Sequence, residues 1–238
     1  MANNLIGNKT KMKLLEINES HFKNMLKIHD SDGGNLVNES LSKLFDCMND
    51  ESNRFEVSIK VAALNQLYST AIQYITPVVN KIVCNIPRDY KNLSENEYAA
   101  LVDRISTATW VSPTTDKNHS RTNLSFASKY IHFLSNRKIP IYDSYIWIVM
   151  IGYLKQEKQQ EKHEKYSFNP PENYEYFYQV FTKFKERSNL QQKSNYGIDK
   201  FLWQYGKNIL NEIIKEKSVG LNEAKSVLKK RITSRTNC

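Results

Sequence analysis

Apolar residues recur at helical spacing along most of this 238-residue chain. In the strongest run, residues 55–83, one helical face carries Val57, Val61, Leu64, Tyr68, Ile72, Ile75 and Val79. Pro77 predicts either a break in this run or the start of a second helix. Weaker amphipathic patterns predict short helices over residues 20–30 and 36–48, and residues 1–19 are predicted to be irregular.

Start signals and periodicity predict further helices. The capping box Ser94-x-x-Glu97 predicts a helix that continues to about residue 107. Apolar spacing predicts helices over residues 124–134, 174–186 and 198–217, and a basic helix over residues 221–235. The polar stretch of residues 110–123 is predicted to be a loop, and the Lys-, Glu- and Gln-rich stretch of residues 155–165 the solvated end of a helix.

These elements favour an all-α fold in a single domain. Seven glycines and six prolines are few for this length, which favours long helices over many-turned β architectures. The chain is long enough to bury one substantial core. We expect two lobes with a cleft between them: residues 55–145 form a central lobe, and residues 1–54 and 146–238 form the second.

The net charge of +9 and the pI of about 9.3 favour a polyanionic partner, because Lys and Arg bind phosphates whatever the base sequence. The same excess fits a chain that is merely soluble or that meets an anionic membrane surface. Cys47, Cys84 and Cys238 lack CxxC spacing, which argues against a disulfide framework or zinc site and fits a reducing cytoplasm. The longest apolar run, residues 146–150, is too short to cross a bilayer, so no membrane partner is expected.

The most informative motif covers residues 124–147, LSFASKYIHFLSNRKIPIYDSYIW. It predicts an apolar helix, a basic turn, an extended segment at Ile139 ahead of Pro140, and a second helix that begins at Asp143 as its N-cap. A carboxylate at such a point is fixed by backbone N–H groups and can be directed into a cleft. On spacing alone, Asp143 is either a site residue of this kind or only a helix cap.

This motif resembles the core of the helix-hairpin-helix DNA glycosylases, the superfamily of 8-oxoguanine glycosylase and endonuclease III. Residues 140–143, PIYD, resemble the Pro-x-Asp turn of that family with one additional residue. Residues 124–133 resemble the helix that follows its hairpin. The resemblance implies a helix-hairpin-helix-like element, a catalytic role for Asp143, and double-stranded DNA lying across the cleft with one base turned into it.

Excision of a base passes through a positively charged sugar, which a nearby carboxylate stabilises. Asp143 is the candidate for this role. Bifunctional members of the family place a Schiff-base lysine just before the small residue that matches Ala127, where this chain has Ser125 and Phe126. The simplest prediction is therefore a monofunctional enzyme that leaves an abasic site. Lys129 is the alternative amine if the hairpin is offset and its pKa is lowered.

A flipped base needs stacking planes and groups that hydrogen-bond to its edge. The candidates for this base pocket are Asn65, Gln66, Tyr68, Trp110, Tyr142, Trp203 and Tyr205. The candidates for contacts to the DNA backbone are Arg121, Thr122, Asn123, Ser125, Lys129, Arg137 and Lys138. Tyr68 and Tyr205 continue apolar stripes and are alternatively core residues. His132 is expected to be a packing residue, and no metal or other cofactor is expected, because no His or Cys partner stands at ligand spacing.

The leading hypothesis is a DNA glycosylase that acts on a modified base as a monomer. The motif looks bacterial, and some bacterial relatives of this kind serve phage defence. The target is then either a hypermodified phage base, such as glucosylated hydroxymethylcytosine, or an oxidised purine; this choice rests on analogy. One rival is a DNA- or RNA-binding helical protein that uses Asp143 only as a cap. Another is a structural partner protein with residues 174–184 as its contact surface.

Overall fold

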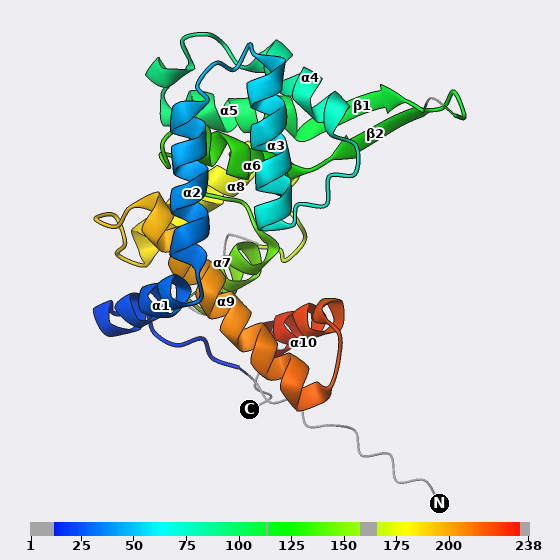
Figure 1. Cartoon of the computed structure of the whole chain (residues 1–238). Helices are drawn as coiled ribbons and strands as arrows, with labels where there is room; N and C mark the ends of the chain where they lie inside the picture. The colour runs from blue at the N-terminus through cyan, green and yellow to red at the C-terminus, as the bar shows by residue number, and fades with distance from the viewer. Residues whose placement is uncertain (1–11, 113, 158–165, 234–238) are drawn as a thin grey trace, which may run out of the picture.

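The computed structural model describes residues 12–112, 114–157 and 166–233 (Figure 1). Within them the chain is mostly helical, which confirms the predicted all-α fold class. The helices are α1 (Glu19–Ser31), α2 (Gly34–Cys47), α3 (Arg54–Tyr68), α4 (Ile75–Asn85), α5 (Glu95–Ser106), α6 (Leu124–Leu134), α7 (Ser144–Glu157), α8 (Tyr174–Arg187), α9 (Asn195–Lys217) and α10 (Leu221–Thr233). The other described elements are a 3-10 turn (Tyr90–Asn92) and the strands β1 (Thr107–Val111) and β2 (Asn118–Thr122).

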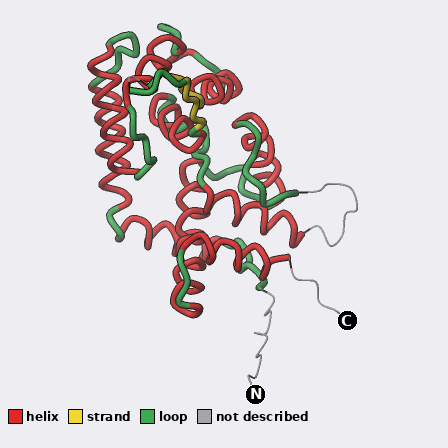
Figure 2. Tube along the Cα trace, turned by 90° about the vertical axis from the view of Figure 1, so that its right-hand side faces the viewer, coloured by secondary structure: helices red, strands yellow, loops and turns green. Residues whose placement is uncertain are grey.

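The helices pack in two groups, which Figure 2 shows from the side. In the first group, α3 packs on α4 and α6, α5 packs on α6 and α8, and α2 lies against α3 and α6. In the second group, the long helix α9 packs on α1, α7 and α10. The predicted division put residues 34–47 and 174–187 in the second lobe, whereas α2 and α8 pack with the first group. Their contacts with α1 and α7 join the two groups.

Helix α6 lies at the centre of the first group. All its residues from Phe126 to Leu134 are buried, including the polar residues Ser128, Lys129 and His132. Burying a polar side chain costs free energy unless it finds a hydrogen-bond partner. The partners of these three side chains therefore determine what this helix does besides packing.

The periodic run of residues 55–83 forms two helices, α3 and α4. The connection between them, residues 69–74, is held by the side chain of Asn65, which hydrogen-bonds to backbone and side-chain atoms of this segment. Pro77 lies in the first turn of α4, which confirms the predicted start of a second helix. The capping box at Ser94 is confirmed as well.

The predicted polar loop of residues 110–123 is wrong, because these residues contribute to a β-hairpin. β1 and β2 pair antiparallel, with Thr107 opposite Thr122 and Trp110 opposite His119. The rings of Trp110 and His119 stack with centroids 5.5 Å apart, a cross-strand contact that stabilises such a pair. The hairpin projects from the body (Figure 1) and β2 is exposed throughout, so the apolar–polar alternation that signals a strand is missing. It directly precedes residues 124–133, where the resemblance implies the hairpin of a helix-hairpin-helix-like element.

Three of the predicted segments lie partly outside the described residues. Helix α7 ends at Glu157, so most of the predicted solvated stretch of residues 155–165 is not described. The same holds for residues 1–11 of the predicted irregular leader and for the end of the predicted basic helix after Thr233. Among the helices that are described, none has the length and apolar character needed to span a bilayer.

Candidate active site

A cavity of about 250 Å³ lies between the two helix groups. Its walls come from the end of α1, the turn that follows it, the start of α2, the end of α3, the middle of α6, the start of α7 and the first half of α9. Lys129 and Asp143 both line it, so the predicted carboxylate and the alternative amine open into one site. The rings of Tyr68, Tyr196 and Trp203 line it as well and offer flat apolar surfaces.

Asp143 is both a helix cap and a cavity residue. Its Oδ1 accepts a hydrogen bond from the backbone N–H of Tyr145 (2.8 Å), and its carbonyl oxygen accepts one from that of Trp147 (2.9 Å). Its Oδ2 lies 3.7 Å from Nζ of Lys129, and the side chain is 22% exposed. One carboxylate oxygen thus fixes the start of α7, as predicted, while the other faces the amine.

Lys129 lies in the second turn of α6, and its side chain is only 5% exposed. Its Nζ donates a hydrogen bond to Oγ of Ser125 (2.6 Å), one helical turn earlier, and lies 5.3 Å from the centre of the Tyr68 ring. Burial lowers the pKa of Lys129, and the carboxylate of Asp143 opposes part of that shift. A lowered pKa increases the share of the neutral amine, which is the nucleophilic form.

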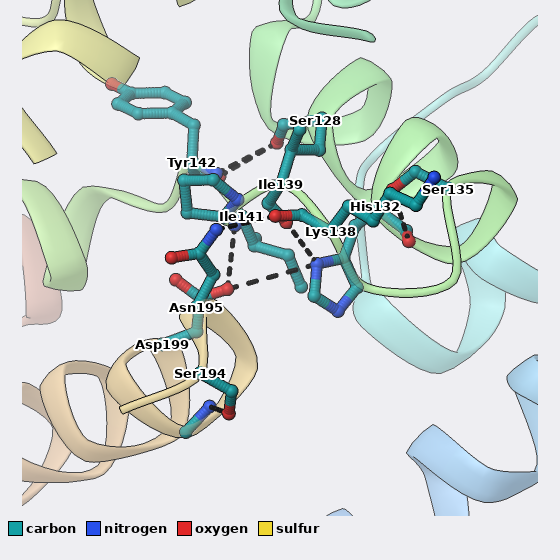
Figure 3. A network of polar contacts seen from close by, with 12 residues as sticks. Ser128, His132, Ser135, Lys138, Ile139, Ile141, Tyr142, Ser194, Asn195 and Asp199 are labelled. Carbon is teal, nitrogen blue, oxygen red and sulfur yellow. Dashed lines mark hydrogen bonds and ion pairs between the residues drawn. The ribbon is translucent and has the colours of Figure 1, made fainter. Parts of the chain in front are cut away.

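Side chains hold the extended segment before Asp143 along its whole length, and Figure 3 shows the contacts made by Ser128, His132 and Asp199. The contacts are Asn195 Nδ2 to the carbonyl of Lys138 (2.5 Å), His132 Nδ1 to the carbonyl of Ile139 (2.6 Å), the Tyr174 hydroxyl to the carbonyl of Pro140, the Ile141 N–H to Asp199 Oδ2 (2.8 Å), and the Tyr142 N–H to Ser128 Oγ (3.0 Å). These side chains come from α6, α8 and α9. The position of Asp143 is therefore fixed by both helix groups at once.

His132 is a buried member of this set of contacts, as the sequence predicts for a packing residue. Burial lowers the pKa of His132 to about 4, so the ring is neutral near pH 7. Because Nδ1 faces the carbonyl oxygen of Ile139, Nδ1 carries the proton and donates. Its Nε2 is buried and finds no hydrogen-bond partner within residues 12–112, 114–157 and 166–233.

Asp199 lies in the first turns of α9 with only 4% of its surface exposed. Its Oδ2 accepts the Ile141 N–H, while its Oδ1 is buried without a partner in the described part of the chain, and the residue lines the cavity. Burial raises the pKa of Asp199 well above its usual range, and the charge of Asp143 adds to that shift. Burial therefore favours the neutral, protonated form of Asp199.

Besides Lys129 and Asp143, two lysine–carboxylate ion pairs of the described residues border the cavity. Lys200 pairs with Asp30 (2.9 Å) and Lys207 with Asp32 (3.1 Å), which ties α9 to the end of α1 and the turn that follows it. Both lysines are thus engaged with carboxylates of another element. They differ in this from Lys129, whose Nζ hydrogen-bonds to a neutral hydroxyl and faces Asp143 at a longer distance.

Two residues predicted for the base pocket, Tyr68 and Trp203, line the cavity. The hydroxyl of Tyr68 donates a hydrogen bond to Oδ1 of Asn38 (2.5 Å), which holds its ring against the cavity. The ammonium group of Lys207 lies 5.1 Å from the centre of the Trp203 ring. The structure therefore brings one predicted aromatic residue from each helix group to the pair of Lys129 and Asp143.

The other five predicted pocket residues lie elsewhere. Asn65 holds the connection after α3, and Gln66 is exposed. Trp110 lies in the hairpin, and the ring of Tyr142 packs edge-on against Phe177 (5.3 Å). The hydroxyl of Tyr205 accepts the N–H of Leu15 (2.8 Å), and its side chain is buried. For Tyr205 the core alternative is the correct one, because its apolar stripe packs inside the protein.

The residues predicted to contact DNA divide into surface and interior positions. Arg121 and Thr122 are exposed on β2, and Lys138 is exposed just before the extended segment. Asn123 is partly buried and caps α6. Lys129 is buried in the cavity, so the prediction that it contacts the DNA backbone from the surface is wrong.

Ser125 and Arg137 also have partners inside the protein. Ser125 accepts the hydrogen bond from Lys129. The guanidinium of Arg137 lies over the ring of Tyr196 (4.3 Å) and donates to Oγ of Ser42 in α2 (2.5 Å). Arg137 therefore ties the turn after α6 to α2 and α9, in place of the predicted phosphate contact.

The sequence reasoning missed Asn38, Tyr196 and Asp199 as cavity residues. For Asp199 a signal was present, because it stands one helical turn before Trp203 and so shares its face. It also follows the apolar Ile198 at the start of a helix whose face is otherwise buried. An acidic residue is rarely buried at such a position unless it has a partner. Asn38 and Tyr196 carry no comparable signal.

Residues 18–138 match the model of the HI_0787_N family, which is described as an N-terminal domain. The match covers just over half of the chain, so the chain belongs to this family. It includes Lys129 but ends before Asp143 and Asp199, so the cavity is built from the matched domain and the residues that follow it. No curated protein and no solved structure matches the chain. Within the described residues, no cluster of three or more His, Cys, Asp and Glu could hold a metal ion.

Proposed function

We propose that this protein is a DNA glycosylase that takes a modified base into the cavity and breaks its N-glycosidic bond. The observation that carries the proposal is the meeting of Lys129 and Asp143, 3.7 Å apart, in one cavity. The resemblance of residues 124–133 and 140–143 to the glycosylase motif supports it, as does the net charge of +9. The pairing of a buried amine with a fixed carboxylate suits a reaction that builds positive charge on a sugar.

In the proposed reaction, the neutral amine of Lys129 attacks C1′ of the deoxyribose. A bond forms between Nζ and C1′ while the bond from C1′ to the base breaks, and its electron pair leaves with the base, which takes up a proton. Asp143 stabilises the positive charge on the sugar and accepts a proton from the attacking amine. The proton that Asp143 accepted then passes to O4′ as the C1′–O4′ bond breaks with its electron pair on O4′, while the nitrogen lone pair forms the C=N bond of a protonated imine on Lys129.

The alternative is the monofunctional reaction, in which Asp143 activates a water molecule and no amine takes part. The environment of Lys129 favours the reaction in which its amine attacks the sugar. Burial lowers the pKa of Lys129, and the water reaction does not require a neutral amine. The family position of the Schiff-base lysine matches Phe126, and Lys129 stands three residues later. Three residues are close to one helical turn, so both positions lie on the same face of α6.

The proposed partner is double-stranded DNA, bound by a monomer in the cytoplasm. The exposed Arg121, Thr122 and Lys138 are the proposed backbone contacts. The rings of Tyr68 and Trp203 would stack on the flipped base. Glucosylated hydroxymethylcytosine in phage DNA and an oxidised purine are the two substrates proposed.

The test is excision from a panel of duplexes with and without these bases, read as strand breaks after alkali treatment. We expect breaks at one class of modified base. Asp143→Asn should lose them by about 10²- to 10⁴-fold while DNA binding is retained, because the carboxylate acts only on the reacting sugar. Folded protein that binds DNA in a salt-dependent way but excises nothing, from phage DNA included, would point to the binding module. Weak, salt-insensitive association would point to the partner protein.

A further inference from the structure

Asp199 stands between the cavity and the segment that carries Asp143. One of its carboxyl oxygens, Oδ2, accepts the N–H of Ile141, two residues before Asp143 (Figure 3). The other, Oδ1, is buried and has no hydrogen-bond partner among the residues that the structure describes. Since Asp199 lines the cavity, a bound molecule is the partner that this oxygen lacks.

We propose that Asp199 couples recognition of the base to the positioning of Asp143, with Oδ2 holding the catalytic segment and Oδ1 hydrogen-bonding to the edge of the base. This inference rests on the proposed glycosylase function and deepens it. Asp199 is a specificity-determining and positioning residue in this account. The reacting sugar is left to Lys129 and Asp143.

The direction of the hydrogen bond to the base follows from the proton on Asp199. The groups that face its carboxyl are the Ile141 N–H, the Nδ1–H of His132 at 4.0 Å, and the carboxylate of Asp143. The Nδ1–H of His132 is committed to the carbonyl of Ile139, and the charge of Asp143 disfavours a second negative charge nearby. In the proposed complex the carboxyl group is protonated; because Oδ2 accepts the Ile141 N–H, the proton then stands on Oδ1, which donates to an acceptor on the base.

The acceptor is a carbonyl oxygen or an unprotonated ring nitrogen of the base. A base that offers one satisfies the buried hydroxyl of the acid, whereas a base that offers only N–H groups leaves it unpaired, and a site of this kind rejects such a base strongly. The hydrogen bond also fixes the rotation of the carboxyl group. It thereby holds Oδ2 in the orientation that accepts the Ile141 N–H, two residues before Asp143.

The test compares Asp199→Asn with Asp199→Ala. Asparagine keeps an acceptor for the Ile141 N–H and an N–H₂ donor for the cavity, so it should excise within about threefold of the unmodified protein. Alanine removes both, and its single-turnover excision should fall by about 10²-fold, the effect of misplacing a reacting group. Gln204→Ala is the matched control: Gln204 is buried on the same helix with its own unpartnered oxygen, but it does not line the cavity.

A binding measurement separates recognition from positioning. Duplexes with the intact modified base and with a tetrahydrofuran abasic analogue are compared for each variant. Asp199→Ala should weaken binding of the duplex with the intact base by about tenfold, because one buried hydrogen bond is lost. Its affinity for the abasic analogue should be unchanged. Gln204→Ala should change neither.

Three results would overturn the inference: full excision by Asp199→Ala, equal loss of affinity for both duplexes, or Asp199→Asn as impaired as Asp199→Ala. The last would show that a charged carboxylate is required. If the unmodified protein excises no base from the panel, the proposed function fails. In that case, loss of base-dependent binding in Asp199→Ala but not in Gln204→Ala would still support recognition of the base by Asp199. Base-dependent binding that Asp199→Ala retains would contradict it.

Discussion

Among the described residues, Lys60 and Lys129 are buried lysines that face a carboxylate, and the two pairs differ in how completely their hydrogen-bonding groups are satisfied. Lys60 is fully buried; its Nζ donates to Oε1 of Glu51 and to the carbonyl oxygen of Met48 (3.0 Å). The second oxygen of Glu51 accepts the hydroxyl of Tyr130 (2.5 Å). Lys129, in contrast, hydrogen-bonds only to a serine hydroxyl among the described contacts, and faces its carboxylate at 3.7 Å across the edge of a cavity.

This difference distinguishes a structural ion pair from a reactive one. A buried pair whose donors and acceptors are all used holds elements together, here the loop before α3 and the helix α6. A buried amine beside a cavity, with a carboxylate near but not in close contact, stays available to a substrate. The same two residue types therefore carry stability in one place and proposed chemistry in the other.

The same substitution in both pairs, Lys→Met, tests whether one pair acts in the chemistry and the other in stability. Lys129→Met should lower base excision by about 10³-fold or more, because it removes the proposed nucleophile. Its free energy of unfolding should stay the same or rise, since a buried amine is replaced by an apolar chain of similar length. Single-turnover excision and urea unfolding measure the two effects. A Lys129→Met variant that excises at the unmodified rate contradicts the role given to the amine.

Lys60→Met should show the opposite pattern. It leaves the carboxylate of Glu51 buried without its cation, which costs about 3–5 kcal/mol of unfolding free energy. At temperatures where the variant stays folded, its excision rate should be close to that of the unmodified protein. Urea unfolding followed by circular dichroism measures the loss. An unchanged midpoint would show that the pair of Lys60 and Glu51 does not hold these elements.

The pH dependence of stability tests the contacts that position Asp143. His132 has a pKa of about 4 in the folded protein against 6.5 in the unfolded chain, so the stability present above pH 6.5 is lost as pH falls towards 4. The loss approaches about 3 kcal/mol. In His132→Asn, which retains a donor for the Ile139 carbonyl and does not titrate, this loss should be absent.

The measurement is the difference in unfolding free energy between the two proteins from pH 7 to pH 4. Asp199, whose pKa is raised, contributes with the opposite sign over this range, but it is present in both proteins and drops out of the difference. A constant difference across the range would mean that His132 titrates normally and is not buried as described.

The smallest expected effect concerns the hairpin. Arg121→Ala should weaken binding of duplex DNA a few-fold and reduce the dependence of log affinity on log salt by about one ion, because one phosphate contact is lost. Lys43→Ala, which removes an exposed charge from α2, is the charge-matched control and should leave that dependence unchanged. Equal effects of the two substitutions would assign the hairpin no special part in DNA binding.

Much of the fold could be predicted because its helices are long, periodic and marked by caps. The turn at residues 32–34, the capping box at Ser94 and the cap at Asp143 are local signals that tertiary contacts do not override. The hairpin was missed because both of its faces meet solvent over much of its length, so burial imposes no alternation on it. The sequence also does not predict which helices pack in which group, because this grouping depends on long-range packing.

The candidate site was predictable only in part, for a related reason. The carboxylate could be placed from the cap and the motif, and Trp203 from its aromatic character. Lys129 was assigned both to the DNA surface and, alternatively, to the chemistry, since spacing alone does not reveal whether a lysine on an apolar helix is buried. The contact of Asp199 with the Ile141 N–H joins residues that are 58 positions apart in the chain, and no local sequence pattern predicts such a contact.

Trapping with borohydride tests the central claim most directly. Reduction during the reaction with a substrate duplex should convert the imine into a stable amine link, giving a covalent protein–DNA adduct whose peptide map places the DNA on Lys129. The adduct should be absent from Lys129→Met. Excision of the base with no adduct, or with an adduct at another lysine, would contradict the account of the site given by Lys129 and Asp143.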